Sequence, residues 1–143
     1  MAKTPRRAAM NATRDDTLPI RESDDVVRVR QAVRVQAIAA GLGLVDQTKI
    51  ITAASELARN TLDYGLGGTA RIETFTVPPR RGVRLTFEDS GPGIPDLDRA
   101  LTDGYTTGGG LGLGLSGARR LCNDFEIRSV VGEGTYIMIA RWK

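Results

Sequence analysis

Residues 85–121 read LTFEDSGPGIPDLDRALTDGYTTGGGLGLGLSGARRL, and the rest of the chain is organised around them. The stretch begins as an apolar strand, breaks at the DSGPG segment of residues 89–93, and continues through a short helical piece. It then passes through a glycine-rich segment into an amphipathic helix. A glycine-rich segment that leads into a helix N-terminus lets backbone N–H groups and the helix dipole face a phosphate. The stretch therefore predicts a nucleotide-binding site.

The glycine-rich segment consists of Thr106, Thr107, Gly108, Gly109, Gly110, Leu111, Gly112, Leu113 and Gly114. A flexible linker is the alternative interpretation, but a linker does not need glycines that alternate with leucines and run on into a helix. The segment lacks the Gly-Lys-Ser/Thr of a Walker loop. A formal GxGxxG occurs, but an antiparallel hairpin is predicted to follow it where a dinucleotide-binding unit needs a parallel strand. We therefore favour a nucleotide site of another type.

Composition indicates one globular domain. The chain has 143 residues, 41% of them hydrophobic and 26% charged, which are ordinary values for a soluble protein. No apolar run approaches the ~20 residues of a membrane span, and no apolar signal core is present. The single cysteine, Cys122, excludes an internal disulfide and fits a reducing cytoplasm. The absence of histidine means that acid–base chemistry must depend on a carboxylate.

The net charge of +3 does not indicate a nucleic-acid-binding protein. Part of it lies near the N-terminus, and the few aromatic residues are not interleaved with the basic ones as nucleic-acid binding would require. Residues 1–17 lack periodicity and are expected to form a flexible basic arm. Residues 18–143 are expected to form the single folded domain.

The apolar periodicity of that domain predicts an α+β fold. Residues 18–20 suit a short edge strand, because proline is tolerated there. Helices are expected over residues 23–40, 46–64 and 112–123. The first would begin with a cap at Ser23-Asp24-Asp25. The second would turn a stripe inward, formed by Ile50, Ala54, Leu57 and Thr61. Strands are expected over 71–77 and 83–88, around a turn at 78–82, and over 125–127 and 136–140. This order predicts a two-layer sandwich in which helices cover one face of a sheet.

Glu56 and Asn60 are the first candidate site residues. They are four residues apart on the second predicted helix and so share one face, at the boundary of its apolar stripe. A carboxamide oxygen suits Mg²⁺ beside phosphate oxygens, and a carboxylate one turn away could accept a proton from an attacking hydroxyl. The alternative is an ordinary solvated helix face, which short patterns of this kind often are.

Asp89 is the second candidate, because it ends a predicted strand and precedes Gly91 and Gly93. One interpretation is a tight turn in which the carboxylate bonds its own backbone. The other is a carboxylate that accepts a hydrogen bond from an exocyclic amine, with the two glycines allowing a flat base to approach the backbone. The residues alone leave both open.

Taken together, these motifs and the segment GEGT at 132–135 resemble the four boxes of the GHKL ATPase/kinase superfamily. That superfamily includes histidine-kinase catalytic domains, gyrase B, Hsp90 and MutL. Order and spacing match over about residues 18–143. The small size and the segments ELARN, DGYTT and GLGLGLSGARRL look most like RsbT-type switch kinases, within the family of anti-sigma-factor serine/threonine kinases.

The resemblance implies a Bergerat-type ATP-binding fold, with a mixed, mostly antiparallel sheet and helices on one face. It implies ATP and Mg²⁺ as cofactors. Asp89 would bind the adenine amine with support from Gly91 and Gly93, and Thr135 would join the water network around adenine. Asn60 would ligate Mg²⁺, Glu56 would be the general base, and residues 106–114 would form the ATP lid.

The resemblance also implies partners. RsbT-type kinases phosphorylate a serine or threonine of a STAS-domain antagonist and, once released, activate a PP2C-type phosphatase in stressosome and sigma-factor control. The alternative is an anti-sigma factor or nucleotide-gated binding module that mainly sequesters a partner. Residues 102–111 contain no lysine or arginine. Backbone amides, Mg²⁺ or a partner's basic residue must therefore neutralise the γ-phosphate.

Overall fold

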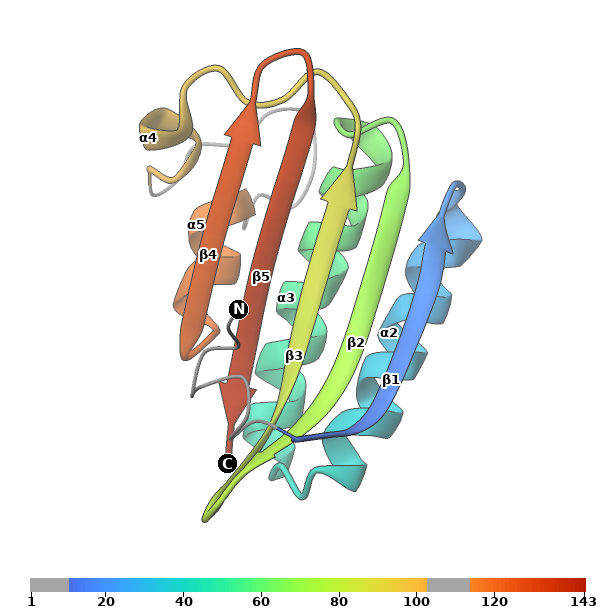
Figure 1. The fold of residues 1–143 in the computed structure, drawn as a ribbon, viewed down its shortest axis with the longest axis vertical. Helices are drawn as coiled ribbons and strands as arrows, with labels where there is room; N and C mark the ends of the chain where they lie inside the picture. Colours follow the sequence, from blue (N-terminus) through green and yellow to red (C-terminus); the bar gives the residue numbers. More distant parts are fainter. Residues whose placement is uncertain (1–10, 103–113) are drawn as a thin grey trace, which may run out of the picture.

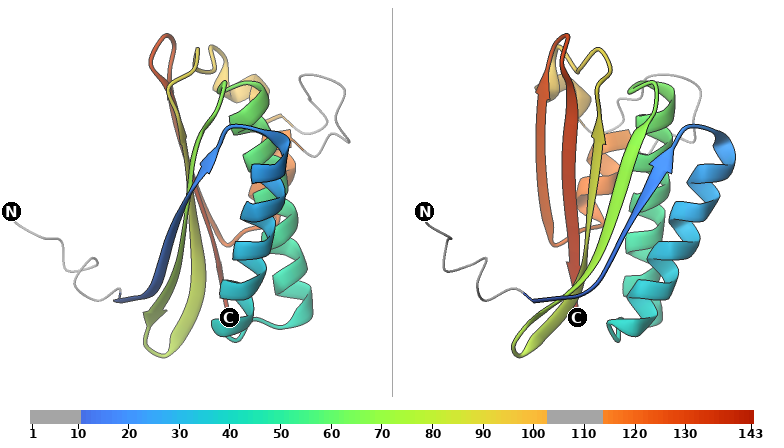
Figure 2. Two further views of the ribbon diagram at one scale, coloured as in Figure 1. Left: turned by 90° about the vertical axis from the view of Figure 1, so that its right-hand side faces the viewer. Right: turned by 45° about the vertical axis from the view of Figure 1, so that its right-hand side comes forward.

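The computed structural model describes residues 11–102 and 114–143. A single five-stranded sheet is covered on one face by helices, so the predicted two-layer α+β sandwich is confirmed (Figures 1 and 2). The elements in chain order are β1 (Asn11–Ile20), α2 (Ser23–Ala39), α3 (Leu44–Asp63), β2 (Gly68–Val77), β3 (Arg80–Asp89), α4 (Leu97–Ala100), α5 (Gly114–Arg120), β4 (Asp124–Val130) and β5 (Gly134–Trp142).

The strand order is β1-β2-β3-β5-β4, and all four ladders that join the described strands are antiparallel. The described sheet is therefore antiparallel throughout, whereas the resemblance implied a mixed, mostly antiparallel sheet. Both predicted hairpins form, and in the first of them β3 already begins at Arg80, inside the expected turn. Pairing of β3 with β5 brings Asp89 opposite Thr135, at the end of the sheet where α3 finishes.

The hydrophobic core lies between the helices and the inner face of the sheet. The predicted stripe on α3 is confirmed, since Ile50, Ala54, Leu57 and Thr61 are all buried. Leu85 and Phe87 of β3 are buried in the same core. No helix in the described part of the chain is both long and apolar enough to cross a membrane.

The expected flexible arm is too long, because β1 begins at Asn11 rather than at Leu18. The first half of β1 consists mainly of polar and charged residues, and two of them have partners on other elements. Arg71 of β2 donates to Asp15 at 2.6 Å, and Gln36 of α2 donates to Asp16 at 2.8 Å. Because those partners are distant in sequence, an apolar pattern could not reveal the strand. Residues 1–10 lie outside the described residues.

Three helix boundaries differ from the predictions. The N-cap of α2 is Glu22, and the carboxylate of Asp25 accepts a hydrogen bond from its backbone N–H at 3.2 Å. Helix α3 begins at Leu44, after the N-cap Gly43, instead of at residue 46, and Asp46 forms an ion pair with Arg141 at 2.8 Å. Helix α5 ends at Arg120 rather than at Asn123, whose side-chain oxygen accepts from the backbone N–H of Trp142 at 2.7 Å.

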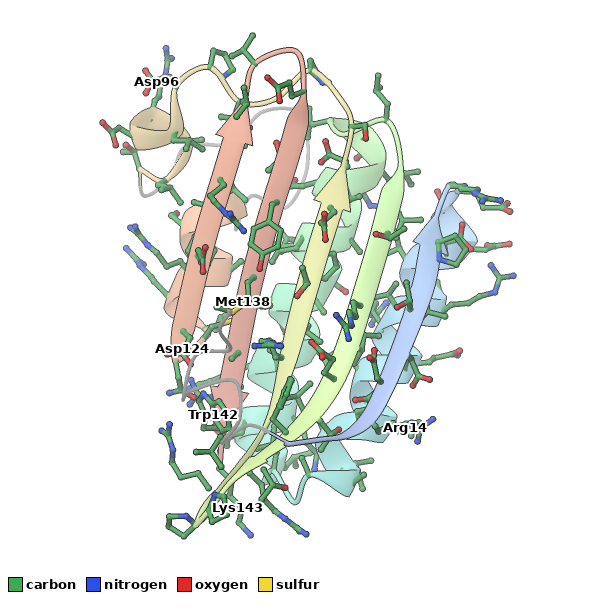
Figure 3. The ribbon with its side chains drawn as sticks, viewed as in Figure 1. Arg14, Asp96, Asp124, Met138, Trp142 and Lys143 are labelled. Atoms are coloured by element: carbon green, nitrogen blue, oxygen red, sulfur yellow. The ribbon has the colours of Figure 1, made fainter. Side chains whose placement is uncertain are left out.

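The outer face of the sheet carries mainly polar and charged side chains, and no helix among the described residues covers it (Figure 3). Trp142 lies on this face beside Asp124, to which its indole N–H donates at 2.7 Å. The guanidinium group of Arg80 lies 4.7 Å from the centre of the Trp142 ring. Contacts within the chain therefore account for the position of this tryptophan.

Candidate nucleotide-binding site

Three loops meet at the end of the sheet that carries Asp89: residues 64–67 after α3, residues 90–93 after β3, and residues 131–133 between β4 and β5 (Figure 1). Asp89 is half-buried at the last position of β3. Its Oδ1 accepts from the backbone N–H of Gly91 at 3.0 Å and of Thr135 at 3.3 Å. The turn interpretation is therefore confirmed for Oδ1. No residue in the described ranges donates to Oδ2, so this oxygen is free to accept a ligand's proton.

Gly65 is a site residue that the sequence did not reveal. A Cβ added there would overlap the carboxyl group of Asp89, so only glycine lets this carboxylate lie against the end of α3. The backbone N–H of Gly65 donates to the carbonyl of Asn60 at 3.1 Å. Gly65 therefore packs against the carboxyl group of Asp89 and is hydrogen-bonded to the last turn of α3.

The two glycines after Asp89 are needed for contacts between backbones. A Cβ on Gly91 would lie 2.6 Å from the carbonyl oxygen of Gly65. Gly93 has φ +79°, and a Cβ there would lie 2.5 Å from the carbonyl oxygen of Val130. This packing alone requires glycine at both positions. The approach of a base to them stays a prediction.

Thr135 lies opposite Asp89 in the sheet. Beside Thr135 lies Ser129, which the sequence did not indicate as a site residue. The two hydroxyl oxygens are 2.8 Å apart, and the Ser129 hydroxyl also accepts from the backbone N–H of Ile94 at 2.7 Å. These hydroxyls connect the hairpin of β4 and β5 to the loop after β3. The sequence predicts the hairpin to which Ser129 belongs. It does not predict the strand register that pairs Ser129 with Thr135.

Glu56 and Asn60 both lie half-buried on α3, one turn apart as predicted. The Oε1 atom of Glu56 accepts a hydrogen bond from the backbone N–H of Gly114 at 3.2 Å. Gly114 is the first residue of α5, so the structure joins the carboxylate to the end of the glycine-rich segment. The rest of that segment, residues 106–113, lies outside the described residues.

The donor set fits a nucleotide with its bound Mg²⁺ better than an independent metal centre. Residues 11–102 and 114–143 contain no group of three or more Asp, Glu, Cys or His side chains that could hold a metal ion. Mg²⁺ typically keeps several waters and takes one or two protein ligands beside phosphate oxygens. Asn60 could supply such a ligand, with Glu56 one turn away.

Cys122 takes no part in this site. Burial raises the pKa of its thiol to about 12, so the reactive thiolate is scarce at neutral pH. Its environment is that of a structural thiol.

Known proteins that resemble this chain in sequence or in fold include ATPases and kinases. Residues 45–143 match the family described as histidine kinase-, DNA gyrase B- and HSP90-like ATPases. The serine/threonine-protein kinase RsbT of Bacillus subtilis (strain 168) is 46% identical over 118 residues, which are 82% of this chain and 89% of that protein. A solved structure of the RsbU and RsbW domains of a Mycobacterium tuberculosis protein aligns with a TM-score of 0.61 at 18% identity. That alignment covers 90% of this chain and 32% of the other, and it shows a shared fold.

Proposed function

The chain belongs to the family of histidine kinase-, DNA gyrase B- and HSP90-like ATPases, and we propose that it transfers phosphate from ATP to a serine or threonine of a STAS-domain protein. The likeness to RsbT over most of both chains supports a protein serine/threonine kinase that works by partner switching. Release from the STAS-domain protein would leave the kinase free to bind and activate a PP2C-type phosphatase in sigma-factor control.

The contact between Glu56 and Gly114 is the observation that carries this proposal. It places a carboxylate 3.2 Å from the amide that ends the glycine-rich segment, where the phosphates of a nucleotide would lie. Glu56 is then positioned to accept the proton of the attacking serine or threonine hydroxyl. Asn60, one turn further along α3, would hold the Mg²⁺ that bridges the phosphates.

Asp89 supplies nucleotide specificity in this proposal. Its Oδ1 is occupied by two backbone N–H groups, which orient the carboxylate so that Oδ2 can accept from the exocyclic amine of adenine. Thr135 and Ser129 present hydroxyls beside it that can hold ordered water around the base.

Mass spectrometry of purified components tests the proposal. The protein is incubated with Mg-ATP and with purified STAS-domain proteins encoded in the same genome. A single phosphoryl group on a serine or threonine of one of them is expected. Glu56→Ala should reduce the transfer rate by about 10²–10⁴-fold, the usual contribution of a general base, and leave ATP affinity unchanged. Glu88→Ala, an exposed glutamate on the outer face of β3, is the matched control.

Two outcomes would contradict this assignment. Equal loss of transfer and ATP binding in Glu56→Ala would show that Glu56 is not the base. ATP binding by the wild-type protein without transfer to any STAS-domain protein would favour an anti-sigma factor or a nucleotide-gated binding module.

A further inference from the structure

Exposed apolar side chains surround the end of the sheet that carries Asp89. We call them the apolar rim, and its members are Tyr64, Leu66, Val130 and Val131. Tyr64 and Leu66 lie in the loop after α3, and Val130 and Val131 lie at the end of β4 and in the loop that follows it. The loop after β3 joins the two pairs: Gly91 lies against Gly65, and the carbonyl of Pro92 accepts from the N–H of Gly132 at 2.8 Å. The rim is therefore continuous with the candidate nucleotide site.

Leu66 is the unusual member of the apolar rim. Its φ of +63° makes it the one non-glycine residue with positive φ in the described part of the chain. Glycine or asparagine adopts this conformation more easily than leucine does. The Leu66 side chain is 79% exposed, so the strained backbone is not balanced by burial within the chain. Strain of this kind points to a function outside the folding of the chain itself.

We propose that the apolar rim, with Leu66 as its anchor, docks the protein that receives the phosphate. This inference rests on the proposed kinase function. Phosphoryl transfer requires the acceptor hydroxyl to reach Glu56, so the acceptor protein must cover the surface around the site.

Leu66 lies close enough to Glu56 to belong to the same protein interface. Seven residues of α3 separate Glu56 from Asp63, the last residue of the helix, or about 10 Å along the helix axis at 1.5 Å per residue. A standard interface buries roughly 800 Å² on each partner. Leu66 follows three residues after Asp63, so an interface of this size, seated over Glu56, can extend to it. An exposed apolar side chain on a fixed backbone suits a docking contact, because little freedom is lost when it binds.

Two substitutions at Leu66 separate docking from folding. Leu66→Asn and Leu66→Gly both remove the apolar side chain and relieve the backbone, so neither should lower the melting temperature. Steady-state kinetics with the STAS-domain substrate should show its KM raised by about tenfold, the effect of losing a modest interface anchor. The kcat and the ATP affinity should stay unchanged.

Leu44→Asn is the matched control. Leu44 is similarly exposed, at 73%, but it lies at the start of α3, at the opposite end of the helix from the site. Its substitution should leave the KM for the protein substrate unchanged.

Four results would overturn the inference. An unchanged KM in both Leu66 variants, with the wild-type protein active, would show that the acceptor docks elsewhere. A loss of ATP affinity would assign Leu66 to the nucleotide site, and a change in native mass would assign it to contact with a second copy of the chain. If the wild-type protein phosphorylates no STAS-domain protein, the proposed function fails and this inference fails with it.

Discussion

At the scale of single residues, Asp89 offers the cleanest test of nucleotide recognition. Asp89→Asn keeps a carbonyl oxygen that can accept from Gly91 and Thr135. It replaces Oδ2 with an NH₂ group, which meets the amine of adenine as a second donor. We expect the Kd for Mg-ATP, measured by calorimetry, to rise at least about tenfold, with little change in melting temperature. Asp96→Asn changes another aspartate that accepts a backbone N–H, at the N-cap of α4, and should leave the Kd unchanged. An unaltered Kd in Asp89→Asn would remove the adenine contact from the proposal.

The site residues that the sequence did not indicate are those whose contacts come from segments far away in the sequence. Asp89, Glu56 and Thr135 carry side chains whose chemistry can be read from residue type and spacing. Gly65 matters only because a carboxylate from β3 lies where its side chain would be. No local pattern contains that information, since it depends on how α3 ends against the sheet.

At the scale of elements, one buried side chain of α2 links β1 to the helix layer, in addition to the ladder that joins β1 to β2. Gln36 of α2 is fully buried, donates to Asp16 at 2.8 Å and to the carbonyl of Ile72 at 3.0 Å, and accepts from Thr74 at 2.9 Å. Gln36→Met removes all three hydrogen bonds at similar volume. We expect the free energy of unfolding to fall by about 2 kcal/mol, because buried polar groups lose partners there. Amide hydrogen exchange should accelerate first in β1.

The exposed glutamine of the same helix provides the control for this prediction. Gln31→Met places the same side chain on the solvent face of α2 and should change stability by less than about 0.5 kcal/mol. Uniform exchange across the sheet in Gln36→Met would show that Gln36 does not serve β1 in particular.

The elements that the sequence revealed are those with an apolar period. The buried stripes of α2 and α3 and the inward residues of β3 pack against one neighbouring layer, so the spacing of apolar residues along the sequence is enough to predict these elements. The first half of β1 depends on Asp15 and Asp16 meeting Arg71 and Gln36, which are far away in sequence. An edge strand can be this polar, because one side of it has no neighbouring strand. The polar sequence of residues 11–17 therefore led to the prediction of a flexible arm there.

At the scale of the whole molecule, the architecture separates stability from function. Helices α2, α3 and α5 cover one face of the sheet, while the loops of the candidate site gather at one end of it (Figure 2). The core and the salt bridges of the outer face lie away from that end. Substitutions in the apolar rim can therefore change binding without unfolding the chain.

The absence of histidine gives the molecule a characteristic pH dependence. No side chain with an ordinary pKa between 5 and 8 is present, so the free energy of unfolding should be nearly flat from pH 6 to 8. At lower pH, Asp25 should contribute: a hydrogen bond from the backbone N–H of Arg21, assisted by Glu22 and Arg28, lowers the pKa of its carboxyl below the usual value of about 3.9. The unfolded chain binds a proton there more readily. The stabilisation is therefore complete above the unfolded pKa and is lost as the pH falls through the folded one.

Asp25→Asn tests this account by urea denaturation at stepped pH. The variant should be less stable than the wild-type protein at pH 7, and the difference should close as the pH falls through the lowered pKa of Asp25. Asp24→Asn is the control, because Asp24 is the exposed neighbour in the same helical turn. It removes the same charge without the backbone contacts that Asp25 makes at the start of α2. If both variants kept a constant difference from the wild-type protein at every pH, the acid dependence would have to come from other carboxylates, first among them Asp15, whose pKa is lowered by its hydrogen bond to Arg71.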